Sequence, residues 1–139
     1  MIIVDTGFWI ALADRNDDTH GAAVSALRAV REGLITTWPV VTETCHLLAS
    51  RLAPSAAIEF VRRGQEEAFE IFDLRLSHLP RIEALMNKYE DLPMDLADAS
   101  LVILAEELGS GRILSTDRRD FRTYRWKNRK PFKNLLVLD

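Results

Sequence analysis

The chain has 139 residues, of which 47% are hydrophobic and 28% charged, a balance that suits one globular domain over residues 1–139. A single cysteine, Cys45, excludes an internal disulfide framework and a metal site built from several thiolates, and the net formal charge is only −3. We expect a cytoplasmic protein with no membrane partner, because the N-terminus does not resemble a secretory signal and no apolar run approaches the roughly 18 residues of a membrane-spanning helix.

Short apolar runs alternate with stretches of helical periodicity along the chain. The first half predicts a strand at residues 2–4, helices over 6–13 and about 22–30, a strand at 34–37 and a helix over about 39–52. The second half predicts a helix over 54–63, a strand at 69–72, helices over 77–90 and about 94–108, a strand at 113–114 and an edge strand at 135–138. This alternation is typical of a parallel sheet covered on both faces, so we predict a three-layer α/β/α domain.

Acidic residues follow two of the predicted strands. Asp5 comes directly after the first strand, and Asp117 follows the strand at 113–114. In open α/β sheets the ligand crevice lies beyond the carboxyl ends of the strands, so both carboxylates are expected at one edge. Asp95 and Asp98 lie three residues apart in a first helical turn and therefore share a face. Each acid taken alone could merely cap a helix, but their shared location indicates a site.

A fourth acid, Glu43, lies about one turn into the helix that follows the strand at 34–37, so it begins near the same edge. Thr6, next to Asp5, is a candidate helix cap, and its hydroxyl could instead help hold water in a metal site. His46 lies three residues after Glu43 but forms no ligand motif with His20 or His78, which favours a packing or surface role.

Several carboxylates in one crevice cannot all stay ionised without compensation, so the pattern implies raised pKa values or a bound cation. Oxygen ligands without a cysteine or histidine cluster favour Mg²⁺ or Mn²⁺ over zinc. Such ions activate water and stabilise charge on a phosphodiester undergoing cleavage, in sites with one metal or two. Hydrolysis of nucleic acid is the natural use of this chemistry.

The C-terminal part of the chain is basic. Residues 118–139 contain 8 Lys and Arg against 2 Asp and Glu, whereas residues 1–117 contain 10 against 19. Aromatic side chains interleave these cations, a combination that suits a phosphate backbone with stacked bases. A solvated face that balances the acidic body is the alternative. The candidate nucleic-acid-binding residues are Arg118, Arg119, Arg122, Arg125 and Lys127.

Four segments together resemble the PIN-domain ribonucleases, particularly the VapC-type toxins of bacterial and archaeal toxin–antitoxin pairs. They are Asp5-Thr6, residues 39–43, residues 94–102 (Met-Asp-Leu-Ala-Asp-Ala-Ser-Leu-Val) and residues 115–121 (Ser-Thr-Asp-Arg-Arg-Asp-Phe). The resemblance implies a catalytic quartet that binds Mg²⁺ or Mn²⁺ for RNA cleavage: Asp5, Glu43, Asp98 and Asp117, with Asp5 and Asp98 as principal ligands. It also implies supporting positions at Thr6, Asp95, Ser115, Thr116 and Asp120, with Ser115 standing where family members often have threonine.

The same resemblance implies a PIN-like fold with a parallel sheet of about five strands, a homodimer, and inhibition by a cognate antitoxin protein that occupies a groove near the active site. Two alternatives stay open: a PIN nuclease of RNA processing without a toxin role, and a noncatalytic module that binds RNA or a partner. An aspartyl-phosphate protein is disfavoured. A phosphatase of that kind would have a second Asp where this chain has Gly7, and a receiver domain would have a Lys after a late strand, where residues 113–116 lead instead into Asp117.

Overall fold

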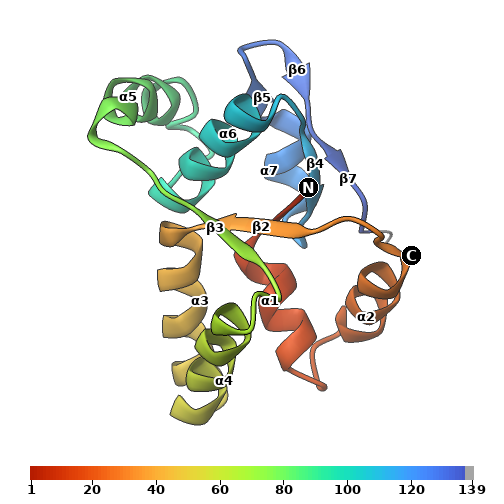
Figure 1. Cartoon of the computed structure of the whole chain (residues 1–139). Helices are drawn as coiled ribbons and strands as arrows, with labels where there is room; N and C mark the ends of the chain where they lie inside the picture. Colours follow the sequence, from red (N-terminus) through yellow and green to blue (C-terminus); the bar gives the residue numbers. More distant parts are fainter. Residues whose placement is uncertain (137–139) are drawn as a thin grey trace.

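A five-stranded parallel sheet forms the middle layer of the computed structural model, which describes residues 1–136 (Figure 1). Its strands are β1 (Ile2–Val4), β2 (Leu34–Thr37), β3 (Glu70–Phe72), β4 (Arg112–Leu114) and β7 (Lys133–Asn134). The order across the sheet is β3-β2-β1-β4-β7, and every neighbouring pair is parallel. The predicted three-layer α/β/α architecture is therefore confirmed.

The helices divide between the two faces of the sheet (Figure 1). One face carries α1 (Thr6–Ala13), α2 (His20–Ala29), α3 (Trp38–Arg51) and α4 (Pro54–Gln65), and the other carries α5 (Leu79–Lys88), α6 (Leu96–Leu108) and α7 (Arg118–Thr123), with a 3₁₀ turn η1 (Leu76–His78) before α5. Right-handed crossovers explain the division, because the chain moves outward from β1 to β3 and then returns to β4 on the other side. The direction of winding thus reverses between β1 and β4, which makes that boundary the switch point of the sheet.

The core surrounds β1 and α6. All three residues of β1 are fully buried, and α6 presents a continuous run of buried residues from Ala99 to Ala105 because it packs between the sheet, α3 and α5. Burial of Leu101 and Leu104 contributes roughly 1.5–3 kcal/mol each. Gly109, with a φ of 69°, ends α6 where the sequence predicts a stop. Among residues 1–136, no helix has both the length and the apolar character that crossing a bilayer requires.

The C-terminal segment differs from prediction. The edge strand is β7, at Lys133–Asn134, so the strand predicted at 135–138 is wrong in position; residues 137 and 138 of that prediction lie outside the described part. An unpredicted antiparallel hairpin, β5 (Arg125–Trp126) and β6 (Lys130–Pro131), precedes it. Strands of two residues are too short to show an alternation of apolar and polar side chains, so the sequence pattern does not predict them. The predicted helix over 77–90 begins as the 3₁₀ turn and ends at Lys88.

Candidate functional site

Three of the predicted acids cap helices at the carboxyl edge of the sheet. Asp5 caps α1, Asp95 caps α6 and Asp117 caps α7, each by accepting a hydrogen bond from an amide of its own helix. The capping alternative is therefore true of these residues, and it is also what fixes their carboxylates at this edge. The bonds run from Thr6 N to Asp5 Oδ1 (2.7 Å), from Asp98 N to Asp95 Oδ1 (2.8 Å) and from Asp120 N to Asp117 Oδ1 (3.1 Å).

Ser115 links the two strands at the switch point. Its fully buried hydroxyl donates to Asp5 Oδ2 (2.9 Å) and accepts from the amide of Asp117 (2.9 Å). The side chain of Asn134 on β7 in turn donates to the Ser115 carbonyl (2.8 Å) and accepts from the Ser115 amide (3.2 Å). Hydrogen bonds therefore run from β1 through the end of β4 to β7. Sequence reasoning missed Asn134, because nothing local connects it to a serine 19 residues earlier.

The carboxylate of Asp98 lies in the first turn of α6 and accepts a hydrogen bond from the Tyr124 hydroxyl at its Oδ2 (2.9 Å). Tyr124 is fully buried, and its ring makes edge contacts with Tyr89 and Phe121 at centroid distances of 5.0 and 5.2 Å. The packed ring holds the hydroxyl in place, so Tyr124 orients Asp98. The sequence indicated Tyr124 only as one aromatic among the basic residues, since its partner lies 26 positions away.

Burial and neighbouring carboxylates raise the pKa values of Asp5 and Asp98. Burial raises the pKa of Asp5 to about 6, and the charges of Glu43 and Asp117 add to the effect. Burial likewise raises the pKa of Asp98 to about 8, with further contributions from Asp95, Asp5 and Asp117. The structure thus brings Glu43 of α3, Asp98 of α6 and Asp117 at the start of α7 within electrostatic reach of Asp5. The catalytic role of each remains a prediction.

Asp117 and Asp120 form a second acidic pair on α7. Burial raises the pKa of Asp117, and a hydrogen bond with the side chain of Asp120 contributes in the same direction. Asp120 is itself buried and lies 3.4 Å from the exposed guanidinium of Arg119. This pair extends the acid cluster along the first turn of α7.

The residues present fit a hard divalent cation. In the described part of the chain, no three acidic, histidine or cysteine side chains stand in an arrangement that could hold one ion as they lie. Mg²⁺ needs fewer protein ligands than that, because it is usually held by one or two carboxylates while water and substrate oxygens complete its shell. The acid cluster can supply one or two carboxylates. The fully oxygen donor set and the raised pKa values of Asp5 and Asp98 both favour cation binding here.

Thr6 supports the same conclusion. It is not the cap of α1, as the sequence suggested, because Asp5 takes that position and Thr6 is the first helical residue. Its hydroxyl is buried and has no hydrogen-bond partner within residues 1–136. A buried hydroxyl without a partner costs free energy, so an oxygen ligand or water held beside Asp5 would satisfy it.

Gly7 and Thr116 bring α1 against the loop that carries Asp117. A Cβ atom built at Gly7 would overlap Thr116 Oγ1 and lie 3.3 Å from Thr116 Cβ, so any larger residue requires the side chain of Thr116 to move. An aspartate at this position, as an aspartyl-phosphate phosphatase would need, would meet the same contact. Thr116 therefore acts by packing at the point where the two acid-bearing segments meet.

The predicted nucleic-acid-binding residues separate into two groups. Arg118, Arg119 and Arg122 lie on α7, directly after Asp117, and their side chains are exposed. Arg125 instead donates through Nη1 to the carbonyls of the last turn of α7, at 2.7 Å for the nearest. Lys127 lies in the hairpin turn with a φ of 50°, and its ammonium is 5.8 Å from the ring centre of Trp126. The three arginines of α7 therefore follow Asp117 closely in sequence, and Arg119 lies 3.4 Å from Asp120.

Fold and site together define a three-layer α/β protein with a carboxylate cluster at the switch point of its sheet, suited to a divalent metal. The chain belongs to the PIN domain family, whose model matches residues 2–127. It is 27% identical over 124 residues to Ribonuclease VapC26 of Mycobacterium tuberculosis, an alignment that covers 89% of this chain and 92% of the relative. It also superposes on the crystal structure of M. tuberculosis VapC20, described as a sarcin-ricin loop cleaving toxin, with a TM-score of 0.80, 21% identity, and coverage of 86% of this chain and 92% of that one.

We predict that Gly7→Ala separates α1 from the loop of Thr116 and Asp117. Overpacking of this kind costs about 1–3 kcal/mol, and it outweighs the roughly 1 kcal/mol that alanine gains over glycine within a helix. Thr116→Ala removes the hydroxyl that the new Cβ would meet, so the double variant should recover most of the lost stability. Denaturant unfolding of both single variants and the double variant measures the coupling, and strictly additive effects would contradict the proposed contact.

We predict that the metal-free protein loses stability as pH rises. The folded-state pKa values of Asp5, about 6, and Asp98, about 8, exceed the ordinary 3.8, so the native state keeps protons that the unfolded chain has released. This stabilisation is fully present below a pH of about 4 and is lost as pH rises through 6 and then 8. Thermal unfolding in EDTA should therefore show a falling Tm across this range. Asp98→Asn keeps an acceptor for the Tyr124 hydroxyl but has no proton to lose, so the Tm of this variant should fall less between about pH 7 and about pH 9. An unchanged fall of Tm over that range would contradict a raised pKa at Asp98.

Proposed function

We propose that this protein is an endoribonuclease that hydrolyses RNA phosphodiester bonds with bound Mg²⁺ or Mn²⁺, and that it is the toxin of a type II toxin–antitoxin pair in the cytoplasm. The observation that carries the proposal is the gathering of Asp98, Asp117 and Glu43 around the buried Asp5 at the switch point of a PIN domain, close enough for their charges to raise the pKa values of Asp5 and Asp98. A bound cation compensates the repulsion among carboxylates that lie so close together. Two relatives support the substrate class and the toxin role, since VapC26 is named a ribonuclease and VapC20 is described as a toxin that cleaves the sarcin-ricin loop.

In this mechanism Asp5 and Asp98 hold the metal, with Glu43 and Asp117 completing the acidic site. A divalent cation supplies activation of water and neutralises charge on the phosphate during cleavage. The protein contributes orientation: Thr6 N and Ser115 fix the two oxygens of Asp5, and Tyr124 fixes one oxygen of Asp98. A carboxylate that is not bound to the metal accepts the proton of the attacking water. Asp117 suits that role, because burial raises its pKa towards the working pH.

In this proposal the exposed arginines of α7 bind the RNA backbone. Arg118 immediately follows Asp117, so positive charge lies next to the acids and compensates their repulsion of phosphate. Arg119 shares this position, although Asp120 lies 3.4 Å from its guanidinium. Arg125 contributes less to RNA in this scheme, because its guanidinium already binds three carbonyl oxygens.

We predict that Asp98→Asn abolishes RNA cleavage while leaving the fold intact. The amide keeps an oxygen for the Tyr124 hydroxyl but has no charge to hold a cation, so we expect a loss of at least about 100-fold, the upper range for supporting residues of metal sites. The measurement is cleavage of a mixed pool of single-stranded and structured RNA in Mg²⁺, Mn²⁺ or EDTA. The exposed Asp18→Asn, in the α1–α2 turn, is the matched control.

Each outcome separates the candidate functions. Metal-dependent cleavage that is lost in Asp98→Asn and kept in Asp18→Asn supports the nuclease. Undiminished cleavage by a folded Asp98→Asn protein would refute the metal site. RNA binding without cleavage under any metal would favour the noncatalytic module. Growth arrest on expression, relieved by a small protein encoded beside this chain, would separate a toxin from a nuclease of RNA processing.

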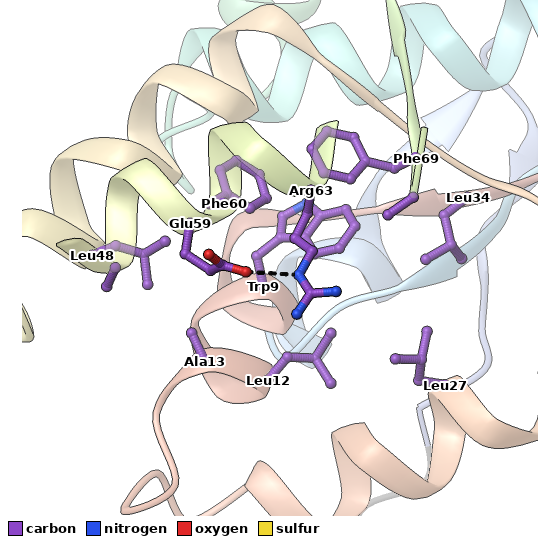
Figure 2. Close-up of a pocket in the computed structure, with 12 residues that line it drawn as sticks. Trp9, Leu12, Ala13, Leu27, Leu34, Leu48, Glu59, Phe60, Arg63 and Phe69 are labelled. Atoms are coloured by element: carbon purple, nitrogen blue, oxygen red, sulfur yellow. Dashed lines mark hydrogen bonds and ion pairs between the residues drawn. The ribbon is translucent and has the colours of Figure 1, made fainter. Parts of the chain in front are cut away.

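An apolar pocket on the opposite side of the sheet from α6 suits the proposed antitoxin. It has a volume of about 470 Å³ and lies between α1, α2, α3 and α4, with Leu12, Phe60 and Phe69 among its lining residues (Figure 2). Figure 2 also shows the ion pair between Glu59 and Arg63, at 2.9 Å, beside the pocket. An amphipathic helix could place apolar side chains in the pocket and polar groups against this pair. The homodimer implied by the VapC resemblance stays a prediction that light scattering of the purified protein would test.

We predict that Ala56→Glu weakens antitoxin binding, because it places a charge in the lining of this pocket. Ile58→Glu introduces the same charge on the same helix at a residue that is 58% exposed and does not line the pocket, so it is the matched control. The measurement is the amount of antitoxin that copurifies with each variant after coexpression. Equal recovery with both variants would place the antitoxin elsewhere.

A further inference from the structure

A second hollow opens directly beside the acid cluster, where α3 and α6 begin. It has a volume of about 660 Å³, within the range of small-molecule sites. Its lining includes the apolar side chains of Trp38, Leu74 and Leu96 and the acids Glu43 and Asp95. Glu43 therefore belongs both to the hollow and to the predicted catalytic quartet, so a group bound here is continuous with the site of cleavage.

Trp38 is the distinctive residue of this hollow. Half of its surface is exposed, whereas Trp9 and Trp126, the other two tryptophans, are 8% and 6% exposed. Its indole Nε1 donates to Asp73 Oδ1 at 2.7 Å, which fixes the ring rather than leaving it free to turn. Leu96, on the neighbouring helix, is 47% exposed. An anchored aromatic face beside a catalytic site is a surface on which a flat group can stack.

We propose that this hollow binds the base of an unpaired nucleotide next to the cleaved phosphate, with Trp38 as the stacking surface. The inference rests on the proposed ribonuclease function and deepens it. Single-stranded RNA is recognised through bases that leave the stack and lie on aromatic side chains. The chemistry of the walls selects this part of the nucleotide, because Glu43 and Asp95 repel phosphate but not a neutral base. Thr42 and His46, which also line the hollow, supply polar groups for the edge of the base.

A second copy of this chain is the competing occupant, since Trp38 and Leu96 are apolar and exposed. A symmetric contact through the hollow would bring two sets of carboxylates towards each other, including Glu43 and Asp95 from each copy. Like charges facing across an interface oppose association. A base carries no such charge, so the composition of the hollow favours RNA over a second copy.

The test measures RNA binding in EDTA, where the proposed nuclease does not cut. The probes are a single-stranded oligoribonucleotide and an abasic oligomer with the same sugar-phosphate backbone. Because Trp38 is the one tryptophan of the chain with a large exposed surface, stacking should quench the intrinsic fluorescence with the first probe but not with the second. Trp38→Ala should weaken binding of the oligoribonucleotide about 10-fold, within the range measured for loss of one stacked base. Trp38→Phe should retain most of the affinity, and Ile58→Ala, on α4 outside both pockets, should bind like the unaltered protein.

The outcomes distinguish this inference from the function on which it rests. Base-dependent quenching by a protein that never cleaves RNA would support the hollow and refute the nuclease. Metal-dependent cleavage with no base-dependent quenching, and with full RNA affinity in Trp38→Ala, would refute the hollow and leave the nuclease standing. A dimer that becomes monomeric in Trp38→Ala, measured by light scattering, would assign this face to a second copy and overturn the proposal. The quenching readout uses the unaltered chain, so it does not depend on the folding of any variant.

Discussion

The hydroxyl of Ser115 is the contact on which the arrangement of the site depends, because it joins the ends of the two strands between which the sheet reverses its winding. It donates to Asp5 after β1 and accepts from the amide of Asp117 after β4, while Asn134 holds its backbone from β7. With Thr6 N on the other oxygen of Asp5, both oxygens of a buried carboxylate are fixed. Loss of one such bond leaves a buried acceptor unsatisfied, which costs about 1–3 kcal/mol. The contacts that align the strands therefore also position the acids.

Capping and chemistry are two uses of the same carboxylates. Asp5, Asp95 and Asp117 stabilise the first turns of α1, α6 and α7, and each helix N-terminus in return favours negative charge beside it. That compensation is incomplete, because burial still raises the pKa values of Asp5 and Asp98. The fold thus maintains a concentration of charge that is unfavourable by itself and that a cation would relieve. Such local instability at a functional site is supported by well-packed surroundings, here the buried run of α6 and β1.

Much of this fold follows from short-range patterns in the sequence. Apolar strands followed by acids, and the helical spacing before Gly109, predict the sheet, α6 and the edge at which Asp5 and Asp117 meet. The parts that sequence did not predict depend on contacts between distant residues or on weak periodicity. Tyr124 reaches Asp98 across 26 positions, and Asn134 reaches Ser115 across 19, so no local pattern encodes either bond. The β5–β6 hairpin and the position of β7 are built from two-residue strands, too short for alternation to be read.

The division of charge along the chain has a structural consequence for any RNA that reaches the acids. A carboxylate cluster repels the phosphate backbone, so attraction must come from its borders. On one border the arginines of α7 begin with the residue after Asp117, because the helix that this acid caps is the one that carries them. On another border the lining at the start of α3 and α6 is apolar around Trp38, which is the surface that we propose for a neutral base. Cations fix the backbone without regard to sequence, whereas a base-sized hollow responds to which nucleotide is unpaired. If both proposals hold, the affinity for RNA comes mainly from one border of the acid cluster, and the choice of cleavage position from the other.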